Sequence, residues 1–243
     1  MRITRIYHPE NLICGNTTNL DANASNHLIR VLRTKIDTPI VLFNGDSFDY
    51  YCKTLDASTK NTLVAVESRV EVKNESNINI TLIQGISRQD RMEATIQKSV
   101  ELGVNNIIPV LCQRSNTKLT QDKKIKKLAH WRKVAISACE QSGRSVIPEI
   151  TDIMSACDIK QFLKEDTFKI ILNPEAKTSL KDLDINHQKV ELFVGPEGGL
   201  SHEEITFLEN EHFKSIRFGP RILRTETAGP AVISAIQMLW GDF

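Results

Sequence analysis

The order of apolar patterns after residue 77 constrains the fold of this chain more than any other feature. Short continuous apolar runs, typical of buried strands, alternate with segments in which apolar residues recur every three or four positions, as on one face of a helix. The segment 90–102 has the helical pattern, with Met92, Ile96 and Val100 on one face. Because the alternation continues over roughly 170 residues, it predicts an α/β domain with a mostly parallel sheet.

The elements of this domain can be bounded from the same patterns. The predicted strands cover residues 78–85, 106–111, 168–172, 190–194 and 216–218. The predicted helices cover residues 90–102, 123–142, 155–164, 201–211 and 227–240. Asp90 can cap the first of these helices, and Ser201 with Glu204 forms a capping box at the fourth. Ligands bind at the carboxyl ends of strands in such sheets, which selects the loops that begin at Gly195 and Gly219.

The beginning of the chain follows a different pattern. Short strand patterns cover residues 40–43, 48–55 and 62–70. A short helix is expected near residues 25–32, and the polar segment 73–77 is typical of a linker. We therefore predict two domains, with residues 1–72 as a small β-barrel or sandwich and residues 73–243 as the α/β domain.

The loop Gly195-Pro196-Glu197-Gly198-Gly199 joins a predicted buried strand to a capped helix. Its glycines let the backbone approach a ligand closely, and Pro196 stiffens the turn. The spacing matches neither nucleotide fingerprint, and Glu197 is a poor neighbour for a pyrophosphate. A ligand with positive charge, such as one with a sulfonium and an ammonium group, would be repelled less by that carboxylate than a pyrophosphate would. The alternative is a tight strand-to-helix connection that binds nothing.

The loop at residues 219–228 places two arginines, a glutamate and two threonines around an apolar pair. Ile222 and Leu223 can line an adenine slot while their backbone groups read the ring edge. The alternative is an ordinary helix entrance, in which Thr225 is the cap, Glu226 favours the first turn and the arginines are solvated. Two such loops after strands of one sheet favour a ligand site.

Two basic features have roles that the residues leave open. The net charge is only +1, but lysines and arginines gather between Lys118 and Lys133, on either a solvated helix face or a surface that contacts phosphates. Arg144 follows Gly143, a natural C-cap for the helix 123–142, and is either an end-of-helix charge or an RNA contact.

Cysteine content and hydropathy narrow the cellular context. The five cysteines are scattered without a C-x-x-C pair, which argues against a zinc site or a disulfide framework and suits a reducing compartment. The N-terminal segment lacks the apolar core of a signal peptide, and the chain has no apolar run near the roughly 20 residues that span a membrane. We expect a cytoplasmic protein with no metal and no membrane contact.

Two motifs together identify a family. GPEGGLSHEE at residues 195–204, followed by GPRILRTETA at residues 219–228, resembles the ribosomal RNA small subunit methyltransferase E family of the SPOUT superfamily. DRMEATIQKSVELGV, ACEQSGR and NHLIRVLR extend the resemblance over most of the chain. Gly229-Pro230-Ala231 departs from the family's smoother helical run, so the last helix is expected to start late or to bend. Gln89 stands where the family usually has a glycine.

The resemblance implies a fold and an activity. Family members have an N-terminal PUA-like RNA-binding β-barrel and a C-terminal SPOUT domain with a deep trefoil knot, which the residue patterns by themselves do not predict. They are homodimers that use S-adenosylmethionine (S-adenosyl-L-methionine) to methylate N3 of one uridine in 16S ribosomal RNA, within the small ribosomal subunit.

The resemblance also implies roles for individual residues. The cofactor would be held by Leu172, Asn173, Phe193, Val194, Gly195, Pro196, Glu197, Gly198, Phe218, Gly219, Ile222, Leu223 and Thr227. Arg221, Arg224 and Glu226 would be catalytic, and Arg30, Arg33 and Arg144 would bind RNA. The alternatives are a related methyltransferase for another RNA, such as a transfer RNA, and an RNA-binding assembly factor without activity. A third alternative is an α/β enzyme that uses another nucleotide. The absence of the glycine-rich phosphate-binding motifs from this sequence argues against it.

Overall fold

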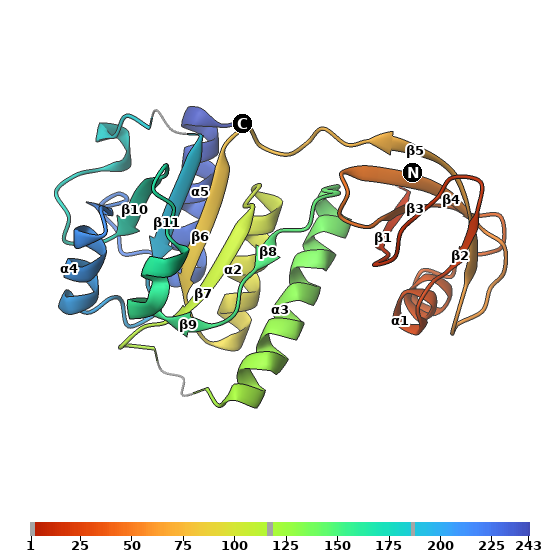
Figure 1. Cartoon of the computed structure of the whole chain (residues 1–243), viewed down its shortest axis with the longest axis horizontal. Helices are drawn as coiled ribbons and strands as arrows, with labels where there is room; N and C mark the ends of the chain where they lie inside the picture. Colours follow the sequence, from red (N-terminus) through yellow and green to blue (C-terminus); the bar gives the residue numbers. More distant parts are fainter. Residues whose placement is uncertain (1–2, 116–118, 186–187) are drawn as a thin grey trace. The chain divides into compact units, whose positions relative to one another are not determined.

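Figure 1 shows the chain as a computed structural model, which describes residues 3–115, 119–185 and 188–243. The chain divides into two compact units: unit 1 contains Met1–Glu75 and Cys139–Ile147, and unit 2 contains Ser76–Ala138 and Pro148–Phe243. Unit 1 thus takes in a late segment, residues 139–147, that the predicted domain of residues 1–72 does not include. Lys118, the first residue of the basic run, lies outside the described residues.

Unit 1 is built on a mixed sheet. Its strands are β1 (Thr4–Tyr7), β2 (Thr17–Asn19), β3 (Pro39–Phe43), β4 (Phe48–Thr54) and β5 (Leu63–Glu71). They lie in the order β1-β3-β4-β5-β2, with β1 parallel to β3 and the other pairs antiparallel. The three predicted strands are confirmed as β3, β4 and β5, and the buried core includes Leu20, Leu28 and Tyr50.

The short helix predicted near residues 25–32 forms as two consecutive pieces. α1 (Ala22–Asn26) begins after Asp21, whose carboxylate accepts a hydrogen bond from the Ala24 amide at 2.8 Å. The π-helix η1 (His27–Val31) follows directly and carries the exposed Arg30.

The segment 139–147 is held in unit 1 by polar contacts with β1. The Arg5 guanidinium donates to the Arg144 carbonyl at 3.1 Å and to Ser145 Oγ at 3.0 Å. The Tyr7 amide donates to Glu140 Oε1 at 3.0 Å, and burial raises the pKa of the Glu140 carboxyl despite that bond. These contacts join residues more than 130 positions apart, so no local pattern could predict them.

Unit 2 contains a parallel sheet, as predicted. Its strands are β6 (Asn79–Gly85), β7 (Asn106–Leu111), β8 (Glu149–Ile150), β9 (Met154–Ser155), β10 (Phe168–Leu172), β11 (Lys189–Val194) and β12 (Lys214–Ile216). The order is β12-β10-β11-β6-β7-β8, β9 also pairs with β7, and every described pair is parallel. Neighbouring carboxyl ends therefore meet at one edge, where β12, β10, β11 and β6 end side by side.

Helices cover both faces of this sheet (Figure 1). The helices after residue 76 are α2 (Gln89–Glu101), α3 (Gln121–Ser142), η2 (Ala156–Phe162), η3 (Leu180–Asp182), α4 (His202–Asn210) and α5 (Thr225–Trp240). α2 and α5 pack together and α5 contacts β6 and β11, whereas α4 packs with η2 against a cluster that includes Phe193, Leu208 and Phe213. The capping box is confirmed: the Glu204 amide donates to Ser201 Oγ at 3.1 Å.

Some predicted boundaries are wrong. Asp90 does not cap α2, because the helix begins at Gln89 and Asp90 lies in its first turn, where a carboxylate still favours the helix dipole. The last helix does not start late: α5 begins at Thr225 and continues through Pro230. Its N-cap is Arg224 rather than Thr225.

Four other elements differ from the prediction. The strand predicted at residues 216–218 ends at Ile216, and Arg217 forms an isolated bridge with Ser179. The helix predicted at residues 155–164 is the 3₁₀-helix η2. The two-residue strands β8 and β9 were not predicted, since so short a run carries no periodicity.

The described ranges contain no helix long and apolar enough to cross a membrane. Within the same ranges, no group of three or more histidine, cysteine or acidic side chains is placed to hold a metal ion.

Thiol reactivity offers a direct check of the packing. All five cysteines are described; Cys14 and Cys157 are exposed and the other three are buried. Burial raises the pKa of Cys52 and of Cys139 to about 12, so at neutral pH these thiols are neutral as well as covered. We expect two thiols to react quickly with Ellman's reagent in the folded protein and all five to react in guanidinium. A Cys14→Ser/Cys157→Ser variant should lose the fast phase, and a third fast thiol would contradict this packing.

Candidate functional site

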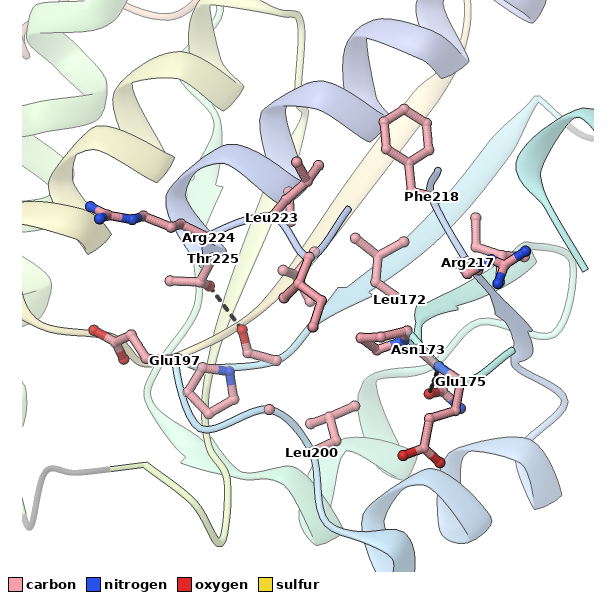
Figure 2. Close-up of a pocket in the computed structure, with 18 of the residues that line it drawn as sticks. Leu172, Asn173, Glu175, Glu197, Leu200, Arg217, Phe218, Leu223, Arg224 and Thr225 are labelled. Carbon is pink, nitrogen blue, oxygen red and sulfur yellow. Dashed lines mark hydrogen bonds between the residues drawn. The ribbon is translucent and has the colours of Figure 1, made fainter. Parts of the chain in front are cut away.

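A pocket of about 630 Å³ lies in unit 2 at the carboxyl ends of three strands. Leu172, Val194 and Ile216 are the last residues of β10, β11 and β12, and each of them lines it. The loops after these strands form most of the remaining walls, to which α2 and α4 add a few side chains. In Figure 2, Glu197 and Arg224 lie on one side of the pocket and Glu175 lies on the other.

The structure brings most of the predicted site residues to this pocket. The predicted cofactor residues in its lining are Leu172, Asn173, Val194, Gly195, Pro196, Glu197, Phe218, Gly219, Ile222 and Leu223. Arg221 and Arg224, both predicted as catalytic, also line it. The two loops selected from the sequence therefore meet at one site.

Other predicted residues lie outside this lining. Phe193 is fully buried on the α4 face, where its ring packs edge-on against Phe213 with 6.3 Å between the centroids. Because successive strand residues point to opposite faces, Phe193 supports the pocket from behind Val194 rather than contacting it with its ring. Gly198 and Thr227 are exposed and lie beside the lining rather than in it.

A buried polar chain ties the two loops together. Thr225 Oγ1, in the first turn of α5, donates to the Gly195 carbonyl at 2.8 Å, the bond drawn dashed beside Thr225 in Figure 2. The same oxygen accepts from Gln84 Nε2 at 3.0 Å, and Gln84 lies fully buried on β6. The start of α5 is thus fixed to the end of β11 by a threonine that the prediction treated only as a possible cap.

Glycine is required at the end of β6. A Cβ on Gly85 would lie 2.6 Å from both the Cδ and the backbone nitrogen of Pro196, and 2.9 Å from the Gly195 carbonyl carbon. Those are backbone and ring atoms, which cannot turn away as a flexible side chain would. The close approach therefore presses the 195–199 loop against β6 and sets its position.

Arg91 is a site residue that the sequence analysis missed. It lines the pocket from α2, and its Nη1 donates to Glu197 Oε1 at 3.3 Å while its Nε lies 3.8 Å from Glu226 Oε1. Glu197 also accepts from the Arg88 amide at 2.9 Å. One guanidinium thus contacts a carboxylate from each loop. Arg91 lies inside the DRMEATIQ motif, one position after Asp90, but only the fold brings it to residues more than 100 positions away.

The predicted catalytic residues differ in their surroundings. Arg221 is exposed, and the Arg224 side chain is 77% exposed, with Nη1 4.0 Å from Glu226 Oε1. Glu226 lies outside the pocket lining and its side chain is only 19% exposed. Its Oε2 is buried and, among the residues described, accepts no hydrogen bond. The arrangement is a largely covered carboxylate between the guanidinium groups of Arg91 and Arg224, of which that of Arg224 is the more exposed.

The predicted RNA-binding arginines fall into two groups. Arg30 and Arg33 are exposed near the end of η1, and Arg33 has a positive φ of 54°. Arg144 is only 4% exposed, and its Nε donates to Glu75 Oε1 at 2.9 Å. Its guanidinium is directed into unit 1 because Glu75 and the backbone contacts of Arg5 hold it there, so the surface role expected for Arg144 is not what this geometry favours.

The chain is similar to known proteins over nearly its whole length. A family model described as an RNA methyltransferase domain matches residues 74–237. The ribosomal RNA small subunit methyltransferase E of Buchnera aphidicola subsp. Schizaphis graminum is 37% identical over 99% of this chain and 98% of its own length. The protein of the same name from Buchnera aphidicola subsp. Acyrthosiphon pisum is 32% identical over 100% of this chain and 96% of its own.

Two solved structures are similar over their whole length. A methyltransferase structure from Legionella pneumophila, in complex with the cofactor S-adenosylmethionine, has a TM-score of 0.96 at 37% identity and covers 100% of both chains. A ribosomal RNA small subunit methyltransferase E from Neisseria gonorrhoeae, also bound to S-adenosylmethionine, has a TM-score of 0.93 at 37% identity and the same coverage. With its parallel sheet, its paired loops and these relatives, the chain belongs to the ribosomal RNA small subunit methyltransferase E family.

Proposed function

We propose that this protein transfers the methyl group of S-adenosylmethionine to N3 of one uridine in 16S ribosomal RNA. The observation that carries the proposal is the pocket, in which two loops after strands of one sheet enclose about 630 Å³ beside the exposed Arg221 and Arg224. The names of the relatives and the cofactor held by two similar structures support it.

The residues present fit this cofactor. The cavity is within the usual range for a small-molecule site, about 300–1,000 Å³, and its lining combines apolar side chains with the loop glycines Gly195, Gly199 and Gly219. Glu175 and Glu197 line it, which would disfavour a pyrophosphate but suits a ligand with a sulfonium and an ammonium group. Backbone groups of Ile222 and Leu223 would hold the adenine. When bound, the cofactor supplies a methyl group activated by positively charged sulfur.

The remaining chemistry concerns the uracil. N3 carries a weakly acidic proton, and its removal places negative charge on N3 and on the two carbonyl oxygens that flank it. Arg221 and Arg224, exposed at the pocket, would stabilise that charge, since cationic donors act most strongly where charge develops. Glu226 would accept the proton or hold Arg224 in place, and its Oε1, 4.0 Å from Arg224 Nη1, supports the second of these roles.

We expect Arg91 to act as a positioning residue for both loops. Arg91→Ala removes a guanidinium that contacts Glu197 and Glu226, so the carboxylates of the two loops lose a shared partner. Cofactor affinity, measured by isothermal titration calorimetry, should fall roughly tenfold, equivalent to about 1.4 kcal/mol. The cofactor affinity of Arg91→Lys should lie between those of Arg91→Ala and the wild type, because lysine keeps the positive charge but lacks the planar guanidinium that can donate to two carboxylates.

Lys98→Ala is the matched control for Arg91. Lys98 lies on the same helix and, among the residues that the structure describes, forms an ion pair only with Glu101, at 2.9 Å. An equal loss of affinity in the two variants would mean that Arg91 acts through helix stability and not through the loops.

RNA recognition would involve unit 1 and an exposed base. Arg30 and Arg33 would contact phosphates, which position a protein on RNA without reading sequence. N3 lies on the pairing edge of uracil, so the target must be unpaired or turned out before it reaches the pocket. We further propose that unit 1 is a PUA-like barrel, that unit 2 carries the SPOUT trefoil knot, and that the protein acts as a cytoplasmic homodimer.

The proposal is tested with small ribosomal subunits that lack the modification. Purified protein is incubated with these subunits and methyl-labelled S-adenosylmethionine, and the labelled nucleotide is located by digestion and mass spectrometry. Label on N3 of a single 16S uridine is the expected result. Label on transfer RNA in a parallel reaction would show that the substrate is transfer RNA and not 16S ribosomal RNA. Cofactor binding without transfer to either RNA would reject the uridine assignment, and absence of binding and transfer would favour an assembly factor.

A further inference from the structure

The basic run of α3 is divided by the fold into two sets of side chains. Three of its cations are used within unit 2. Lys124 Nζ donates to the Ile153 carbonyl at 3.4 Å and Arg132 Nη2 donates to the Ile150 carbonyl at 3.2 Å, while Lys127 Nζ lies 5.7 Å from the centre of the Trp131 ring. These side chains support the packing of α3 and are not available to a partner without breaking those contacts.

The other set projects into solvent on a single face. Lys123, Lys126 and Lys133 are exposed, as is His130 between them. At 3.6 residues per turn, positions 123, 126, 130 and 133 fall within about 80° of one another around the helix, over about 15 Å of its length. We call Lys123, Lys126 and Lys133 the α3 lysine stripe.

Along α3 the charge of the stripe is opposed nearby by one exposed carboxylate, that of Asp122 in the first turn. Among the described residues, no carboxylate forms an ion pair within 4.0 Å of Lys123, Lys126 or Lys133. His130 differs, because its Nε2 lies 2.9 Å from Glu93 Oε1 on α2. In a chain whose net charge is only +1, three unpaired cations on one helix face are a local feature rather than a consequence of composition.

We propose that the α3 lysine stripe binds the phosphate backbone of the substrate RNA. This inference rests on the proposed function, and it names a surface of unit 2 that lies outside the pocket and outside the predicted RNA-binding arginines. Ammonium groups about one to two helical turns apart match a chain of phosphates better than they match an isolated anion. An RNA backbone is favoured over an acidic peptide because the stripe presents ammonium groups in a row along about 15 Å of helix, as a chain of phosphates requires, and the one exposed ring between them, His130, already contacts Glu93.

Phosphate contacts have a quantitative signature. Each contact releases condensed counterions, so log K falls with log salt concentration by roughly 0.7 to 0.9 per phosphate contacted. The stripe should therefore contribute about two units of slope if all three lysines bind phosphates, and the contribution should not depend on base sequence.

The test compares two triple variants of the full chain. Binding to in vitro transcribed 16S ribosomal RNA is measured by fluorescence between 50 and 200 mM NaCl, a range over which about 6–10 phosphate contacts change affinity by about 10³–10⁵-fold. The stripe variant is Lys123→Gln/Lys126→Gln/Lys133→Gln. The control variant is Lys164→Gln/Lys181→Gln/Lys189→Gln, which lowers the net charge by the same amount at exposed positions elsewhere on unit 2. Unfolding curves and cofactor titrations verify that both variants keep the fold and the pocket.

The expected result is specific to the stripe. The stripe variant should lose about two units of salt slope and bind roughly tenfold more weakly at 100 mM NaCl, with the same loss on an RNA of scrambled sequence. The control variant should keep the wild-type slope. Equal slopes for the stripe variant and the wild type would overturn the inference and leave the proposed function intact. Equal losses in both variants would overturn it as well, because net charge would then explain the effect. Failure of the wild type to bind the RNA would reject both.

Discussion

Arg224→Ala should lower the rate of RNA methylation by about 100- to 1,000-fold and leave the fold intact, because removing one donor to a developing anion has an effect of this size. The Arg224 side chain is 77% exposed and its nearest carboxylate contact, with Glu226, is at 4.0 Å, so its truncation removes little packing. The measurement is single-turnover methylation with saturating cofactor and RNA, which separates the rate of transfer from binding.

Two further variants make this result interpretable. Arg224→Lys should recover part of the rate, since it restores the charge without the planar fork. Lys181→Ala removes an exposed cation outside the pocket and should turn over like the wild type. Near-normal methylation by a folded Arg224→Ala protein would remove Arg224 from the catalytic set and leave Arg221 as the remaining exposed candidate.

Gly85→Ala is expected to lower cofactor affinity by at least about tenfold through the position of the 195–199 loop. The added Cβ would meet Pro196 at 2.6 Å, so either β6 or the loop must move. Overpacking of this kind typically costs about 1–3 kcal/mol, and here the displaced atoms belong to the pocket wall. Calorimetric titration with S-adenosylmethionine measures the loss of cofactor affinity, and urea unfolding measures the loss of stability separately.

Gly229→Ala is the matched control for Gly85→Ala. Gly229 is also buried, but a Cβ there would meet its neighbours at 3.7 Å, which is ordinary van der Waals contact. In a helix interior, alanine is favoured over glycine by about 0.5–1 kcal/mol. We therefore expect Gly229→Ala to bind the cofactor normally with equal or greater stability. Wild-type affinity in Gly85→Ala would show that the loop tolerates the displacement and that Gly85 does not set its position.

The local elements of unit 2 were predictable because their signals are local. The i, i+4 recurrence of Met92, Ile96 and Val100 describes α2, and the Ser201–Glu204 box marks the start of α4 at the observed residue. Failures occurred where the local signal was ambiguous. Pro230 indicated a late or bent helix, yet the tertiary packing of α5 on β6, β11 and α2 keeps the helix continuous from Thr225.

The candidate site was predictable in part for a related reason. Loops after strands of a parallel sheet meet at one edge, so selecting the segments at Gly195 and Gly219 required only the strand pattern and the motifs. Arg91 was missed because nothing near it in the sequence identifies its partners, Glu197 and Glu226. The sequence gives no reason to distinguish Arg144 from Arg30, since both are arginines in or next to a predicted helix. In the structure Arg144 donates to Glu75 and is buried, whereas Arg30 is exposed.

The sequence by itself determined most of the longer helices and strands, which loops carry the motifs, and the family to which the chain belongs. These properties depend on periodicity, capping and turn residues, which act over a few positions. The tertiary structure alone decided the strand order β12-β10-β11-β6-β7-β8, the place of residues 139–147 in unit 1, and the contact of Arg91 with both loops. Each of these depends on pairing and packing between residues far apart along the chain, which a local pattern does not encode.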